Sequence, residues 1–199
     1  LLSDKVSLAI FISGRGSNML SIIEAIKNRE IDADVAVVIS DKATAKGVEL
    51  AKGFGITTFV LNVKDYSSKG DYEDDIIRIL KGHGVDLICL AGYMKVVGNT
   101  LLNAYPNRII NIHPSLLPSF RGLNAQKQAL DYGVKYSGCS VHFVNSVLDG
   151  GKIILQDVVQ VLDTDDEESL SRRILEKEHK LYPKAIQKVI ENIFIKERS

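Results

Sequence analysis

Two polar side chains stand two positions apart in the segment 108–113, immediately before Pro114. Asn111 offers a carboxamide and His113 an imidazole, and residues two apart on a strand point to the same face of a sheet. Because proline cannot donate a ladder hydrogen bond, the strand should end at His113, with both side chains near its carboxyl end. Ligands bind at that end in open α/β sheets. A neutral donor beside a proton-transfer group suits a reaction that passes through an oxyanion.

A second polar segment, 145–151, contains Asp149 followed by two glycines. Such a segment between strands is most often only a turn. The alternative is that Asp149 approaches His113 and stabilises its imidazolium, and the sequence alone does not decide between the two. Ser140 and His142 share a face of the preceding run, either as a polar pair within the sheet or as side chains that face the same pocket.

A glycine-rich segment, 13–18, follows the first apolar run and precedes a helical pattern. Exposed N–H groups and the positive end of a helix suit a phosphate. The segment lacks the Lys-Ser/Thr ending of a Walker A loop, and Met19 occupies the third position of Gly-x-Gly-x-x-Gly. A phosphomonoester is therefore favoured over a dinucleotide. The alternative is that Gly14 and Gly16 only turn the chain and Ser17 only caps the helix.

The other reactive residue types are expected to be structural. Cys89 and Cys139 lie in apolar runs, as buried thiols in a reducing cytosol do. Ser115 lacks the Gly-x-Ser-x-Gly elbow of a nucleophile and should cap or turn the chain. The four histidines are scattered and no Cys/His spacing suggests a ligand set, so we expect no metal site.

Apolar β-rich runs alternate with segments of helical period in the first half of the chain. Strands are predicted at residues 6–12, 35–40, 57–61 and 86–91. Helices are predicted at residues 17–28, 45–52 and 72–81. This alternation predicts an α/β fold with a doubly wound, mostly parallel twisted sheet.

The second half of the chain has a different order of predicted strands and helices. A helix at 125–132 separates the strand 108–113 from two closely spaced runs, 139–144 and 153–161. Their connection is too short for a helical crossover, so these C-terminal strands should be antiparallel. A long helix follows from about Glu167, and Pro183 is expected to kink or divide it.

Length and charge limit the possible functions. The 199 residues can bury a full core as one domain, with a nucleotide-fold-like phosphate-binding half, 1–105, and a catalytic half, 106–199. Lys plus Arg and Asp plus Glu balance at 25 each, which gives no global attraction to nucleic acid or membrane. No apolar run approaches the roughly 20 residues of a membrane helix, and no signal-peptide pattern opens the chain. We therefore expect a cytoplasmic protein.

Taken together, these residues resemble the glycinamide ribonucleotide formyltransferases of the folate-dependent formyltransferase family. The strongest matches are Ser-Gly-Arg-Gly-Ser-Asn at 13–18, Asn-Ile-His-Pro-Ser-Leu-Leu-Pro at 111–118 and Leu-Asp-Gly-Gly at 148–151. Further matches lie at 90–94, 140–144 and 178–183, so the resemblance spans nearly the whole chain in order. It implies a Rossmann-like formyltransferase fold and a role in purine biosynthesis. The implied donor is 10-formyltetrahydrofolate, and the implied acceptor is the glycine amine of phosphoribosylglycinamide.

The resemblance also implies roles for particular residues. The catalytic trio would be Asn111, His113 and Asp149, with Ser140 and His142 in support. The substrate phosphate would be held by Gly16, Ser17 and Asn18, and the ribose hydroxyls by Glu178, which otherwise reads as part of a solvated helix face. The residues implied for the folate pocket are Lys69, Met94, Lys95, Val96, Val97, Asn111, Asn145, Ser146, Val147, Leu148 and Asp149. Lys95 stands where many relatives have arginine, so contacts with the folate glutamate tail should differ.

Three other functions are less favoured. A formyltetrahydrofolate hydrolase would carry an extra amino-terminal regulatory domain, and a transfer-RNA formyltransferase a carboxyl-terminal module with a basic face. A non-catalytic nucleotide or folate sensor would not need Asn111, His113 and Asp149 together. We therefore expect direct formyl transfer between small molecules, by a monomer or weak homodimer, without a metal, nucleic acid or membrane.

Overall fold

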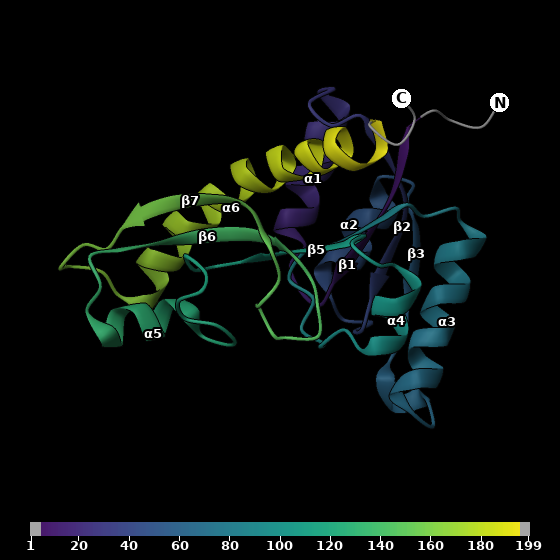
Figure 1. Cartoon of the computed structure of the whole chain (residues 1–199), viewed down its shortest axis with the longest axis horizontal. Helices are drawn as coiled ribbons and strands as arrows, with labels where there is room; N and C mark the ends of the chain where they lie inside the picture. The colour runs from purple at the N-terminus through teal and green to yellow at the C-terminus, as the bar shows by residue number, and fades with distance from the viewer. Residues whose placement is uncertain (1–4, 196–199) are drawn as a thin grey trace.

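The computed structural model describes residues 5–195 and contains one seven-stranded sheet, ordered β3-β2-β1-β4-β5-β6-β7, with helices on both faces (Figure 1). Strands β1 to β5 pair in parallel. Strand β6 is antiparallel to both β5 and β7. The expected mostly parallel, doubly wound sheet with antiparallel C-terminal strands is confirmed.

The elements alternate along the chain as the pattern predicts. The strands are β1 (Val6–Ile12), β2 (Ala33–Ser40), β3 (Thr57–Val60), β4 (Leu87–Leu90), β5 (Ile109–His113), β6 (Tyr136–Phe143) and β7 (Ile153–Gln160). The α-helices are α1 (Ser17–Lys27), α2 (Lys46–Gly53), α3 (Lys69–Gly82), α4 (Asn99–Ala104), α5 (Ala125–Tyr132) and α6 (Glu167–Val189). Two shorter elements are the 3-10 helix η1 (Val63–Asp65) and the π-helical η2 (Ile190–Ile195). Within residues 5–195, no helix combines the length and the apolar composition that crossing a membrane requires.

The differences from the predicted elements have local causes. Helix α4 was not predicted, because its six residues are too few to show a helical period. Helix α3 begins at Lys69, three residues earlier than predicted, because the Ser68 side chain accepts from the Asp71 N–H and caps a polar first turn. Helix α6 continues through Pro183, which is buried within it, so of the two expected effects of Pro183 the division is wrong.

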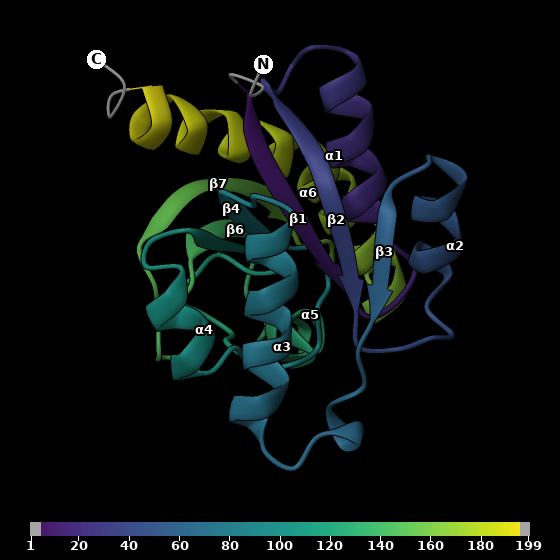
Figure 2. The same ribbon diagram turned by 90° about the vertical axis from the view of Figure 1, so that its right-hand side faces the viewer.

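Alternate residues of β1 enter two separate cores. Leu8, Ile10 and Ile12 pack with apolar residues of α1, α2 and α6. Ala9 and Phe11 point to the opposite face and pack with α3 and α4, which lie in front of the sheet in Figure 2. Burial on both faces explains why the central strands read as continuous apolar runs.

The carboxyl ends of the parallel strands meet at one edge of the sheet and gather the polar loops there. The Ser13 N–H, just after β1, donates to the Gly92 carbonyl after β4 at 3.2 Å. The Ser13 hydroxyl accepts from the Met94 N–H at 2.8 Å. From α6, the Tyr182 hydroxyl donates to the carbonyl of Leu90 at 2.9 Å. These bonds join the loop after β1, the loop after β4 and α6 beside the end of β5.

Candidate active site

The Asn111 carboxamide is oriented by a neighbouring histidine. Asn111 on β5 lies opposite His142 on β6, and its Nδ2 is 3.2 Å from the His142 Nε2. Burial lowers the pKa of His142, so the ring is neutral at pH 7. The Nδ1–H donates to the Phe143 carbonyl at 2.9 Å, which leaves Nε2 as an acceptor. Asn111 therefore gives one amide N–H to His142 and keeps the other for a ligand.

His113 lies between two oxygen acceptors. Its Nδ1 is 3.5 Å from the Asp149 Oδ2, and its Nε2 is 2.9 Å from the Phe120 carbonyl oxygen. Only an imidazolium can donate from both nitrogens, so the surroundings suit a charged ring. The Gly122 N–H donates to the same Asp149 oxygen at 2.8 Å and holds the carboxylate in place. The His113 and Asp149 side chains are only 7% and 8% exposed, so solvent screens their interaction weakly.

The loop between β6 and β7 presents Asp149 to the imidazole through a tight turn. The Asn145 side chain accepts from the Val147 N–H at 3.0 Å and shapes the start of the loop. At Gly151 a Cβ would lie 1.7 Å from the Phe143 carbonyl oxygen, so only glycine fits there. The two sequence-based readings of this segment are therefore compatible, because the turn is what brings the carboxylate to the histidine.

Ser140 holds the chain that leaves β5. Its hydroxyl donates to the Ser115 carbonyl at 2.7 Å and accepts from the Leu117 N–H at 3.0 Å and from Nε2 of Gln156 at 2.9 Å. The Ser115 hydroxyl in turn donates to the Ser119 carbonyl at 2.6 Å. Both serines thus shape the turn after the strand, and Ser115 is bonded as a structural residue rather than a nucleophile.

The two cysteines are buried, free thiols. Burial raises the thiol pKa of both, that of Cys139 to about 12. Since the thiolate is the reactive form, neither thiol is suited to nucleophilic attack. Across residues 5–195, no three His, Cys, Asp or Glu side chains gather in an arrangement that could hold a metal ion.

The glycine-rich segment turns the chain directly into α1. Gly16 is the N-cap residue with φ 77°, and no side chain caps the helix, so the reading of Ser17 as the cap is wrong. The first backbone bond of the helix is from the Leu20 N–H to the Gly16 carbonyl at 2.9 Å. The N–H groups of Ser17, Asn18 and Met19 therefore have no partner within the helix.

Asn18 connects this loop to α6. Its Nδ2 donates to Oε2 of Glu178 at 2.8 Å, and Glu178 is 7% exposed. Burial raises the Glu178 pKa to about 7, although the bond from Asn18 opposes the rise. The Asn18 Oδ1 is buried without a hydrogen-bond partner among the described residues. Glu178 is therefore not part of the solvated helix face. It lies beside the uncapped start of α1, where the Asn18 Oδ1 still lacks a hydrogen-bond partner among the described residues.

The variant Glu178→Gln is expected to remove a pH-dependent cost of folding. Folding raises the carboxyl pKa from 4.5 to about 7, so the folded state binds the proton more tightly than the unfolded state. Wild-type stability should therefore fall relative to the variant as the pH rises from 4.5 to about 7. The total loss is about 3 kcal/mol. Urea unfolding at pH 5 and pH 8 measures it, with Glu176→Gln on the exposed face as control. An equal stability difference at both pH values would contradict a buried proton at Glu178.

Apart from Asn111 on β5 and Lys69 on α3, the residues named for a folate pocket lie in two loops. In the first, Met94 and Val96 are 61% and 62% exposed, whereas Val97 is buried in the core with α3. Nζ of Lys95 is 3.8 Å from Oδ2 of Asp41, a side chain that is only 1% exposed. In the second loop, Val147 and Leu148 are also more than half exposed, at 53% and 55%. Both loops thus present apolar side chains to solvent, which suits a flat aromatic ligand.

Lys69 lies close to the first of these loops. A Cβ at Gly98 would lie 2.9 Å from Cε of Lys69, so the lysine stem packs against this glycine. Glu73, one turn further along α3, accepts from the Gly98 N–H at 2.5 Å and from the Leu101 N–H at 3.2 Å. Helix α3 therefore supports the end of the segment that contains Met94 to Val97.

Three contacts of the site were not predicted from the sequence. The Phe120 carbonyl and the Gly122 N–H are backbone groups, and no residue type at those positions signals such a role. Asp41 is a buried carboxylate with no hydrogen bond among the described residues, paired only through charge with Lys95. Its position at the carboxyl end of a predicted strand was the one available signal.

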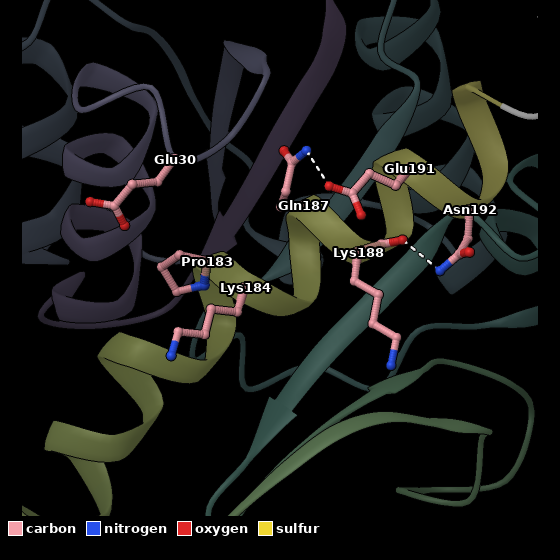
Figure 3. A pocket seen from close by; sticks show the side chains of 7 residues that line it. All are labelled: Glu30, Pro183, Lys184, Gln187, Lys188, Glu191 and Asn192. Carbon is pink, nitrogen blue, oxygen red and sulfur yellow. Dashed lines mark hydrogen bonds between the residues drawn. The ribbon is translucent and has the colours of Figure 1, made fainter.

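A surface hollow of about 490 Å³ lies away from these residues (Figure 3). It is lined by Glu30, beyond the end of α1, and by residues of α6 and η2, namely Pro183, Lys184, Gln187, Lys188, Glu191 and Asn192. Helix α1 begins at the glycine-rich loop, so its far end faces the opposite edge of the sheet. None of the predicted site residues lines this hollow.

Known proteins share this sequence and fold. The sequence profile of the formyl transferase family matches residues 6–186. The chain is 44% identical to a phosphoribosylglycinamide formyltransferase of Bacillus subtilis, over 92% of this chain and 93% of the relative. It is also 44% identical to the trifunctional purine biosynthetic protein adenosine-3 of Drosophila melanogaster, but spans only 14% of that protein. A solved glycinamide ribonucleotide transformylase 1 from Symbiobacterium toebii has a TM-score of 0.91 and 47% identity, covering 92% of this chain and 87% of the other.

Proposed function

Since this chain belongs to the formyl transferase family, we propose that it transfers the formyl group of 10-formyltetrahydrofolate to the glycine amine of phosphoribosylglycinamide. The products are formylglycinamide ribonucleotide and tetrahydrofolate, in purine biosynthesis. The observation that carries this proposal is the oriented Asn111 carboxamide on the same strand as the buried His113–Asp149 pair. A carboxamide donor and an imidazolium are the groups that a formyl-transfer oxyanion needs.

The transfer proceeds without a covalent enzyme intermediate and without a metal. The neutral amine attacks the formyl carbon, which becomes tetrahedral, and the carbonyl oxygen becomes an oxyanion. The free N–H of Asn111 donates to this oxygen, while charged His113 stabilises it. As the oxyanion collapses and the bond between the formyl carbon and the folate nitrogen breaks, His113 gives its proton to that nitrogen, and the ring takes up the proton that the attacking amine loses. Asp149 keeps the ring charged and correctly oriented.

The acceptor binds between α1 and α6. Gly16, Ser17 and Asn18 hold its phosphate, and Glu178 holds its ribose hydroxyls. The uncapped start of α1 supports the first assignment, because its N–H groups lack helical partners and lie at the positive end of the helix. The buried Asn18–Glu178 bond supports the second, because it places a carboxyl beside the loop.

The folate lies against the loops 94–97 and 145–149, with Asn111 between them on β5. Exposed apolar side chains on both loops support this placement. Lys69 and Lys95 are the cations for the glutamate tail. The charge of Lys95 is shared with buried Asp41, so its attraction for the tail should be weaker than that of an unpaired cation.

We further propose that residues 1–199 act as one formyltransferase domain, with phosphate binding in 1–105 and catalysis and folate binding in 106–199. The Asn18–Glu178 bond joins these halves, so the acceptor site belongs to both. The protein works in the cytoplasm as a monomer or weak homodimer, without nucleic acid or membrane. Its balanced charge supports the part of this proposal that concerns nucleic acid and membrane.

An ultraviolet assay of 10-formyltetrahydrofolate turnover, with and without phosphoribosylglycinamide, tests the function in wild type and in His113→Ala. Turnover that needs the glycinamide and falls by at least about 100-fold in the variant is expected. Turnover without any acceptor would identify a hydrolase instead. Ligand-induced thermal shifts without turnover would identify a sensor.

A further inference from the structure

Helix α2 rests on the glycine-rich loop through direct backbone contact. The Gly47 N–H, in the first turn of α2, donates to the Gly14 carbonyl at 3.0 Å. A Cβ on Gly47 would lie 3.1 Å from Cα of Gly16, and a Cβ on Gly16 would lie 2.8 Å from Cα of Gly47. A methyl group at position 16 would clash with the backbone of α2, and one at position 47 would displace the loop backbone by a few tenths of an ångström, so the two backbones touch.

This contact holds the middle of the loop, between Ser13, which bonds to the loop after β4, and Asn18, which bonds to Glu178. Gly16 has φ 77° and begins α1 without any side-chain cap, so no cap fixes the direction of the first N–H groups. Around Gly14, an added Cβ would meet nothing within 4 Å. The backbone bond to Gly47 and the glycine–glycine contact therefore fix the middle of the loop against α2.

The same contact is remote from the reacting groups. Helix α2 packs against β2 and β3 at one end of the sheet, whereas Asn111 and His113 lie on β5 and Asp149 follows β6. A displacement of the loop by α2 should therefore alter how the phosphate is held and leave the formyl-transfer chemistry intact.

We propose that Gly47 is a positioning residue for the acceptor phosphate, and that it sets the preference of the enzyme for phosphorylated over unphosphorylated acceptors. The inference rests on the proposed function, which assigns the phosphate to Gly16, Ser17 and Asn18. A methyl group at position 47 pushes the loop away from α2 and misdirects its N–H groups. Hydrogen bonds to a charged group are lost when donor direction and distance are wrong.

Helix α2 supplies a matched control. Gly53 is its last residue, and a Cβ there would meet nothing within 4 Å. Gly47→Ala and Gly53→Ala therefore make the same chemical change in one helix, and only the first touches the loop. Both variants are assayed with phosphoribosylglycinamide and with its dephosphorylated riboside.

In Gly47→Ala, the KM for the phosphorylated acceptor is expected to rise about 10- to 100-fold, the value of one hydrogen bond to a charged group. Its kcat and its KM for the riboside should stay near wild type. The preference for the phosphorylated acceptor then falls by the same factor. Gly53→Ala should retain the wild-type preference, whereas a general loss of stability would affect both acceptors alike.

A double variant keeps the test valid if Gly47→Ala alone does not fold because the core cannot accept its methyl group. A Cβ on Gly47 would also lie 2.6 Å from Cδ1 of Ile12, an atom that valine lacks. Ile12→Val with Gly47→Ala relieves that contact and keeps the contact with Gly16. This double variant should lose the preference, and Ile12→Val alone should keep it.

The outcomes separate the two proposals. A wild type that uses both acceptors equally would overturn the phosphate site itself, and the role of Gly47 with it. A wild type that prefers the phosphorylated acceptor, with folded Gly47→Ala variants that prefer it equally, would overturn the role of Gly47 alone.

Discussion

Asn111→Ala is expected to lower turnover about 100- to 1000-fold, the usual loss when one oxyanion donor is removed. The reason is geometric, because the amide that the neutral His142 holds in one orientation provides the donor. Alanine removes that N–H and leaves the imidazole in place. Steady-state kinetics measure kcat for the variant and for Asn99→Ala, at the exposed start of α4, as control.

The expected loss should lie in kcat rather than in folding. Asn111 is only partly buried, so thermal unfolding should show a modest change. The change includes the cost of leaving the buried His142 Nε2 without its donor. Near wild-type turnover in folded Asn111→Ala would exclude the carboxamide as the oxyanion donor.

Asp149→Asn is expected to lower turnover about 100- to 10,000-fold, as loss of an effective acid–base group does. Asparagine can still accept from the Gly122 N–H through its carbonyl oxygen, so the loop should keep its position. Only the negative charge beside His113 is lost. The His113 ring then lacks the anionic acceptor that faces its Nδ1.

The expected loss should lie in kcat, because the Asp149 carboxylate contacts His113 and is proposed to orient the ring for proton transfer. Asp131→Asn, whose carboxylate pairs with Lys127 on the surface of α5, serves as control. A folded variant with the wild-type rate would remove Asp149 from the mechanism.

Local sequence patterns predicted the parts of the site that depend on strand geometry. The two-residue spacing of Asn111 and His113 placed both on one face, and Pro114 indicated where their strand ends. The strand pattern also placed Ser140 and His142 on a shared face, and the structure pairs them across β5 and β6 with His113 and Asn111. The two-residue alternation of side chains along a strand and the effect of proline on strand pairing are local properties. They can therefore be read from the sequence without knowledge of the fold.

The parts that could not be predicted depend on long-range packing or on the backbone. The distance between His113 and Asp149 depends on how the loop after β6 folds back on the chain after β5. The carbonyl of Phe120 and the N–H of Gly122 act through atoms that every such residue has. Glu178 sits in a helix rich in charges, and only the packing of α1 against α6 shows that it is buried. Without the family resemblance, its composition alone suggested solvent.

The bond between Asn18 and Glu178 also has a consequence for the newly made protein, because it joins residues 160 positions apart. A ribosome adds about 5 to 20 residues per second, so roughly 10 to 30 s separate the synthesis of the two partners. During that interval β1 and the glycine-rich loop exist without the helix that supplies the carboxyl. A nascent chain therefore has the glycine-rich turn before it has the carboxyl, and the proposed acceptor site is complete only when α6 packs onto the sheet.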